Sequence, residues 1–159
     1  MKAGTIIRFV VSLGAPLLCG FLGSLATRPA ISTWYVGLTK PSFSPPNWLF
    51  GPAWTLLYIL MGIAVFIVWS RGVKTPGVKP ALILFAVQLL LNLAWSFIFF
   101  GARSPVGGFI EILFLWAAIL VTMVFFFRVA VAAGWLMVPY IGWVTFATVL
   151  NGTIMRLNG

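Results

Sequence analysis

The sequence contains no histidine, one acidic residue and one cysteine among its 159 residues. Without histidine or a second carboxylate, one chain cannot assemble a Ser-His-Asp triad, a paired-carboxylate acid/base site or an ordinary zinc site. A lone cysteine also excludes an intrachain disulfide. These absences exclude most conventional enzyme mechanisms, and we expect neither a metal nor a cofactor.

Charge is scarce as well, since only 7% of the residues are charged and 62% are hydrophobic. A soluble domain carries about 25% charged residues, so the composition predicts an integral membrane protein. The net charge of +9 comes from ten basic residues that fall mostly between apolar runs and form no contiguous stripe. We therefore predict the lipid bilayer as a partner and no nucleic acid.

Five windows are long and apolar enough to cross about 30 Å of hydrocarbon, which takes roughly 20 residues each. They predict transmembrane helices at residues 6–26, 48–69, 80–101, 105–127 and 134–155. The expected fold is an all-α bundle of five transmembrane helices that forms a single domain over residues 1–159. Six basic residues fall on the N-terminal side and four on the other, which favours a cytoplasmic N-terminus.

One connection differs from the others in length and composition. Residues 28–47 hold Pro29, Pro41, Pro45 and Pro46 together with several aromatic residues. Such a composition is incompatible with regular helix. We expect an ordered loop that covers one end of the bundle as a lid.

The third helix places five side chains on one face, Phe85, Gln88, Asn92, Trp95 and Phe99, because their spacings alternate between three and four residues. Amide side chains are costly against lipid, so this face must look into the bundle. Its amides either bond to neighbouring helices or contact a ligand, and the sequence leaves both open.

Eight tryptophans stand in the chain. Interfacial anchoring accounts for those near helix ends, such as Trp69 and Trp135. Four lie deeper, at Trp54, Trp95, Trp116 and Trp143. These either pack against neighbouring helices or stack on a flat aromatic ligand.

Two single residues are interpreted as structural. The only carboxylate, Glu111, lies roughly 10 Å into its helix, and we expect it to be neutral and hydrogen-bonded to another helix. Cys19 lies among small residues of the first helix and is expected to pack there rather than react.

Several motifs together resemble a known family. Residues 34–54, followed by Leu57-Tyr58, resemble the first loop and second helix of the tryptophan-rich sensory protein/translocator protein family, also called the peripheral-type benzodiazepine receptor family. Residues 88–95 look like its third helix, and residues 139–143 with Ala147, Asn151 and Asn158 look like its fifth. The resemblance covers nearly the whole chain.

The resemblance implies a five-helix bundle, commonly homodimeric, that binds porphyrins or isoquinoline carboxamide and benzodiazepine-type drugs. With Gln88 added from its helical face, the expected ligand-binding residues are Tyr35, Trp54, Tyr58, Gln88, Asn92, Trp95, Trp143, Phe146, Ala147 and Asn151. The sterol motif of animal members has a tyrosine where this chain has Gly152, so we do not expect sterol binding through that motif. A bacterial-type member in the cell membrane fits better.

The favoured function is a receptor or sensor for protoporphyrin IX and related flat ligands, which are held between Trp54, Trp95 and Trp143 with Asn92 and Asn151 as polar anchors. An alternative is light- and oxygen-dependent degradation of bound protoporphyrin, in which Trp54 and Trp143 match the tryptophans implicated in the family. Transport of porphyrins or lipids ranks below both, because five spans show no inverted halves and no ion-coupling carboxylates.

Overall fold

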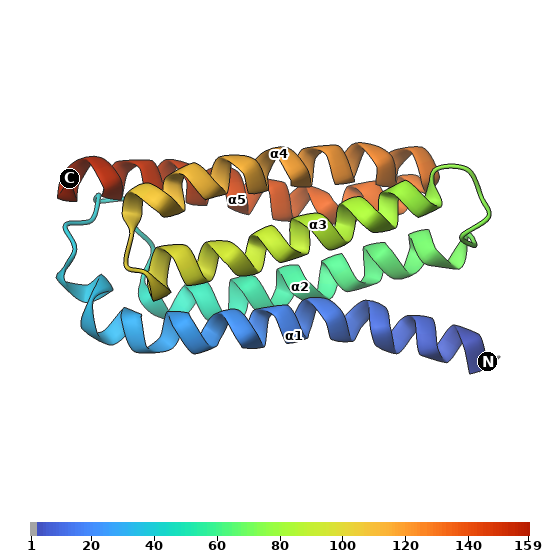
Figure 1. The fold of residues 1–159 in the computed structure, drawn as a ribbon, viewed down its shortest axis with the longest axis horizontal. Coiled ribbons are helices and arrows are strands. Elements are labelled where there is room, and N and C mark those ends of the chain that lie inside the picture. Colours follow the sequence, from blue (N-terminus) through green and yellow to red (C-terminus); the bar gives the residue numbers. More distant parts are fainter. Residues whose placement is uncertain (1–2) are drawn as a thin grey trace.

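The computed structural model describes residues 3–159, and five long helices packed side by side make up nearly all of it (Figure 1). Helix α1 covers Ala3–Thr33, α2 Asn47–Ser70, α3 Val78–Ser96, α4 Pro105–Val129 and α5 Val131–Asn158. Two short turns complete the elements: η1 at Tyr35–Gly37 and η2, a π-helical turn that prolongs α3 through Phe97–Gly101. Residues 3–159 contain no strand, so the all-α prediction is confirmed.

The five helices are long and apolar enough to span a bilayer when α3 and η2 are taken together as one span. Large apolar side chains cover their outer surfaces and are more than half exposed, as at Ile7, Phe21, Leu90 and Phe114. In water such an apolar surface would be unfavourable, whereas lipid tails cover it in a bilayer. The chain is a multi-pass membrane protein.

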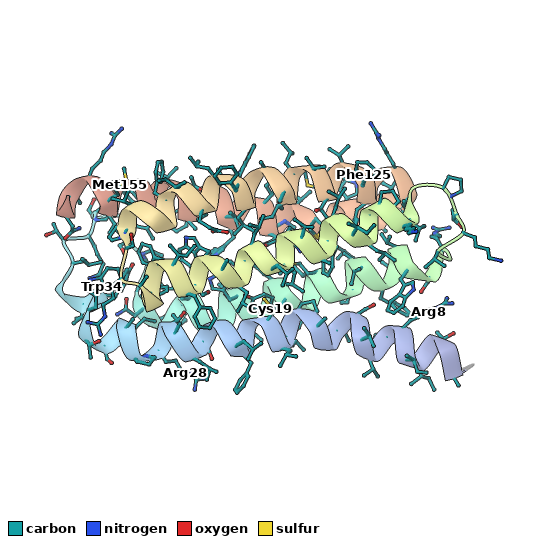
Figure 2. The ribbon with its side chains drawn as sticks, in the orientation of Figure 1. Arg8, Cys19, Arg28, Trp34, Phe125 and Met155 are labelled. Carbon is teal, nitrogen blue, oxygen red and sulfur yellow. The ribbon has the colours of Figure 1, made fainter. Side chains whose placement is uncertain are left out.

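Successive helices run antiparallel, so the N- and C-termini lie at opposite ends of the bundle (Figure 1). One end holds the α1–α2 and α3–α4 connections together with the C-terminus, and we call it the lid end. The opposite end holds the α2–α3 connection and the α4–α5 connection, which is a single residue, Ala130. Figure 2 shows Arg28 and Trp34 at the lid end and Arg8 and Phe125 at the opposite end.

The apolar core lies between α2, α3, α4 and α5. Its largest fully buried side chains include Met61, Ile119, Phe126 and Met137. Helix α1 packs against α2 through Gly62, where an added Cβ would lie only 2.9 Å from the carbonyl oxygen of Ser12. Close backbone contact of this kind is how membrane helices associate without a hydrophobic driving force.

The first helix is longer than the sequence predicts. Residues 28–33 were expected in the loop, but α1 continues through Pro29 to Thr33. Pro29 lacks an N–H and so removes only one helical hydrogen bond, the one to the Leu25 carbonyl oxygen, and this loss falls near the end of the helix. The irregular part of the lid is therefore confined to residues 34–46.

Candidate functional site

The main cavity lies at the lid end and has a volume of about 510 Å³. Such a volume is within the usual range of small-molecule sites. Helices α1, α2 and α5 and the α3–η2 span all contribute to its wall. Six of the ten expected ligand-binding residues line it: Tyr35, Trp54, Tyr58, Trp95, Ala147 and Asn151.

Aromatic rings form much of the wall. The ring of Trp95 stacks on Phe99 with centroids 5.2 Å apart and planes 14° apart. On α2, Trp54 packs on Tyr58 with centroids 5.6 Å apart. These rings line one cavity from α2 and from the α3–η2 span, an arrangement suited to a planar ligand.

The π-helical turn η2 explains how α3 contributes neighbouring rings. Its wider turn is closed by the Ala102 N–H, which donates to the Phe97 carbonyl oxygen at 2.7 Å. Both Phe99 and Phe100 line the cavity, although a regular helix separates adjacent residues by about 100°. Helical periodicity had indicated Phe99 but gave no signal for Phe100.

A buried polar network begins at Tyr58, in the cavity wall, and holds the two amides that were expected to face the ligand. The Tyr58 hydroxyl donates to Asn92 Oδ1 at 2.7 Å, and Asn92 Nδ2 donates to the Tyr140 hydroxyl at 2.9 Å. That hydroxyl in turn donates to Gln88 Oε1 at 2.9 Å. Gln88 and Asn92 do not line the cavity, so the structure places them among helix-to-helix hydrogen bonds.

Asn151 lines the cavity and is fixed by two hydrogen bonds. Its Oδ1 accepts from Trp95 Nε1 at 3.2 Å, and its Nδ2 donates to the Pro105 carbonyl oxygen at 3.0 Å. These bonds connect α5 to α3 and to the start of α4. Because the amide orients the indole of Trp95, Asn151 holds the aromatic wall in place.

The lid is fastened to the bundle at several points. Tyr35 is buried against Phe99 and Phe100, with ring centroids 6.2 and 5.6 Å away. Burial raises the pKa of its phenol, and a hydrogen bond with Ser44 lowers it by a smaller amount. Lys40 Nζ lies 4.7 Å from the centre of the Tyr35 ring and donates to the Tyr35 carbonyl oxygen at 2.8 Å.

A second fastening joins the lid to the last turn of α5. The Thr39 N–H donates to Asn158 Oδ1 at 2.9 Å, and Asn158 Nδ2 donates to the Thr39 carbonyl oxygen at 2.9 Å. One amide side chain therefore pairs with both backbone groups of a lid residue. This clamp ties the middle of the lid to the C-terminal end of α5.

Two of the expected residues, Trp143 and Phe146, lie elsewhere. They line a second hollow of about 490 Å³ between α2, α5 and lid residues Phe43 and Pro45. The ring of Phe50, which lines the main cavity, packs against Trp143 with centroids 6.1 Å apart. The structure thus does not bring Trp143 into the same cavity as Trp54 and Trp95.

The buried carboxyl of Glu111 differs from the sequence expectation. The residue is 8% exposed, and neither carboxyl oxygen has a hydrogen-bond partner within residues 3–159. The prediction that Glu111 is hydrogen-bonded to another helix is therefore wrong.

Cys19 and Trp116 serve packing between helices. The Cys19 thiol is buried and donates to the Leu89 carbonyl oxygen on α3 at 3.4 Å. Trp116 Nε1 donates to Thr145 Oγ1 on α5 at 2.8 Å. Neither residue lines a cavity described above, as expected for Cys19.

Comparison with known proteins agrees with this architecture. The model of the TspO/MBR family matches residues 12–157. The tryptophan-rich protein TspO of Chlorobaculum tepidum is 46% identical over 153 residues, which cover 96% of this chain and 97% of that protein. The translocator protein of Homo sapiens is 40% identical over 91% of this chain and 86% of its own length.

A third relative has a name that states a role. The tryptophan-rich sensory protein of Cereibacter sphaeroides is 38% identical over 158 residues, or 99% of this chain and 94% of that protein. The match of the family model includes the lid and the cavity residues, and each of the three relatives aligns with at least 91% of this chain. The chain belongs to the TspO/MBR family.

Proposed function

We propose that this protein is a membrane receptor or sensor that binds porphyrins, such as protoporphyrin IX, and related flat apolar molecules in the main cavity. The observation that carries the proposal is a cavity whose walls offer the rings of Trp54, Trp95 and Phe99 beneath a fastened lid. Occupancy would change the order of the lid, which a partner protein can detect. The names of its sensory and translocator relatives agree with such a role.

Selectivity for the apolar body of a ligand must come from shape and ring contacts. Burial alone gives an apolar ligand little advantage, because lipid tails are as apolar as the wall. Each aromatic pair contributes about 0.5–1.5 kcal/mol beyond burial. We therefore expect each wall tryptophan to affect affinity by about two- to tenfold.

The test is a titration of the purified protein with protoporphyrin IX in detergent and in the dark. The absorbance of the porphyrin measures the fraction bound. Trp54→Ala and Trp95→Ala should each weaken binding, and the double variant should weaken it further. Trp135→Ala is the matched control, because Trp135 is 63% exposed and packs on Phe127 at the opposite end of the bundle. Wild-type affinity in the double variant, with an unchanged helical signal, would refute the site.

Light- and oxygen-dependent degradation of bound protoporphyrin is a second candidate. It is favoured by the contacts of Trp54 with Tyr58 and Tyr140, whose ring centroids lie 5.6 and 6.2 Å away. Indole and phenol rings supply electrons to an excited porphyrin without any acid/base residue. A product band that is lost in Trp54→Phe and Trp143→Phe and absent with bovine albumin as host would identify an enzyme.

We further propose a homodimer in a bacterial cell membrane with a cytoplasmic N-terminus. Five spans place the two termini on opposite sides, and the end that holds Arg71, Lys74, Lys79 and Arg128 carries more of the basic residues than the lid end. Light scattering in detergent measures the mass, and labelling of a cysteine introduced at either terminus in intact cells reports the orientation. A monomer, or an external N-terminus, would contradict these assignments.

A further inference from the structure

The main cavity extends sideways between α1 and α2. The two helices touch closely at Gly20, where a Cβ atom would clash with the Tyr58 ring. From Gly20 toward the lid end, Ser24 and Arg28 on α1 and Gly51 on α2 line the cavity instead of closing it. Helices α1 and α2 therefore separate between this contact and the lid end.

Side chains at the margin of this opening are exposed on the outer surface of the bundle. Phe21 on α1 is 62% exposed and Trp48 on α2 is 71% exposed, and both also line the cavity. Because the outer surface of the spans faces lipid, these two side chains place the margin of the cavity at the lipid-facing surface of the bundle. The opening lies at the lid end, close to where the bilayer meets water.

Among the described residues, Arg28 is the only one with a formal charge that lines the cavity. The single acidic side chain of the chain, Glu111, lies on α4 and outside the lining. Lys40, the basic residue of the lid, already donates to two backbone carbonyl oxygens, those of Tyr35 and Leu38. Arg28 therefore offers an exposed cation at the cavity margin with no side-chain carboxylate to pair with.

A guanidinium group at this place selects for acidic ligands. Its planar set of donors matches the two oxygens of a carboxylate or a phosphate, which a neutral ligand does not supply. Along α1, Arg28 lies roughly two turns, or about 12 Å, from Gly20, the residue that touches the Tyr58 ring. An acidic group at Arg28 thus leaves room for an apolar body that reaches the aromatic wall.

We propose that the cavity takes an amphiphilic anion, whose carboxylate or phosphate is bound by Arg28 while its apolar body enters between α1 and α2. The proposal rests on the ligand site proposed above and narrows its ligand class. The same chemistry is offered by the carboxylate side chains of a tetrapyrrole and by the phosphate of an anionic lipid. Arg28 is then the residue that determines specificity for charge.

The test compares protoporphyrin IX, which has two carboxylates, with its neutral dimethyl ester, in a nonionic detergent. Wild-type protein should bind the free acid about tenfold more tightly than the ester, and Arg28→Gln should remove that preference without weakening the ester. Arg28→Lys should retain part of it, because an ammonium cannot bind in the bidentate mode. Arg156→Gln is the control, since Arg156 is an exposed cation at the same end that does not line the cavity.

A second arm identifies the source of the anion by native mass spectrometry and by displacement of the porphyrin. Phosphatidic acid that binds and displaces the porphyrin in wild type but not in Arg28→Gln assigns a lipid phosphate, with diacylglycerol as the neutral control. A preference seen only with the porphyrins assigns a tetrapyrrole carboxylate.

If neither porphyrin binds wild type, the proposed function fails, whereas binding of phosphatidic acid that depends on Arg28 would still support this inference. Equal binding of acidic and neutral members of both pairs, or no effect of Arg28→Gln, would overturn it.

Discussion

The clamp between Asn158 and the lid gives the sharpest prediction about ligand access. Replacing Asn158 with alanine removes both hydrogen bonds to the backbone of Thr39, each 2.9 Å long. The third bond of this amide, to the Ile154 carbonyl oxygen, lies within α5 and does not hold the lid. The substitution therefore weakens the attachment of the lid and leaves the helices unchanged.

The expected size of the effect follows from the exposure of the clamp. A net contribution of about 0.5–1.5 kcal/mol applies to an average hydrogen bond, and Asn158 is exposed, so the lower value is appropriate for each bond. The pair then contributes about 1 kcal/mol, which corresponds to about a fivefold rise in the fraction of open lid. The contacts of Tyr35 and Lys40 remain and keep the lid mostly closed.

Amide hydrogen exchange in detergent measures this opening over the lid, residues 34–46, apart from Thr39, whose N–H loses its own acceptor in the variant. Residues 34–46 should exchange about fivefold faster in Asn158→Ala, and bound porphyrin should dissociate faster by a similar factor. Asn158→Asp keeps the acceptor for the Thr39 N–H and loses the donor, so it should give an intermediate rate. Unchanged exchange of the other lid amides in Asn158→Ala would refute the argument that this clamp holds the lid.

Two predictions concern the buried polar groups. Tyr140→Phe leaves Asn92 Nδ2 and Gln88 Oε1 without their partner and should lower stability by about 1–2 kcal/mol, measured as a lower melting temperature in detergent; an unchanged melting temperature would show that these bonds are dispensable. Glu111→Met replaces a buried carboxyl that lacks a partner within residues 3–159 with an apolar side chain of similar size, so it should raise the melting temperature and leave porphyrin affinity unchanged. A lower melting temperature would show that the carboxyl has a stabilising contact.

The membrane character, the five spans and the composition of the lid could all be predicted from the amino-acid sequence. Hydropathy over a window of about 20 residues is a local property, and so is the spacing that put Gln88, Asn92 and Trp95 on one inward face of α3. Periodicity was therefore sufficient to select side chains that are buried in the bundle. It was not sufficient to predict that α1 continues through Pro29, because that depends on where the bonds lost at a proline fall relative to the helix end.

The contacts of each inward side chain depend on the packing of the helices and could not be predicted from the sequence. The amide of Asn92 bonds to Tyr58 and Tyr140 from two other helices, and Trp143 lies behind Phe50 in a separate hollow. Arg28, which the sequence presents as one more basic residue near a helix end, lines the main cavity because α1 and α2 separate beyond Gly20. Helical periodicity fixes the face of one helix, whereas the partner of a polar group depends on how several helices are rotated and shifted against one another. That arrangement is set by the packing of all five spans together.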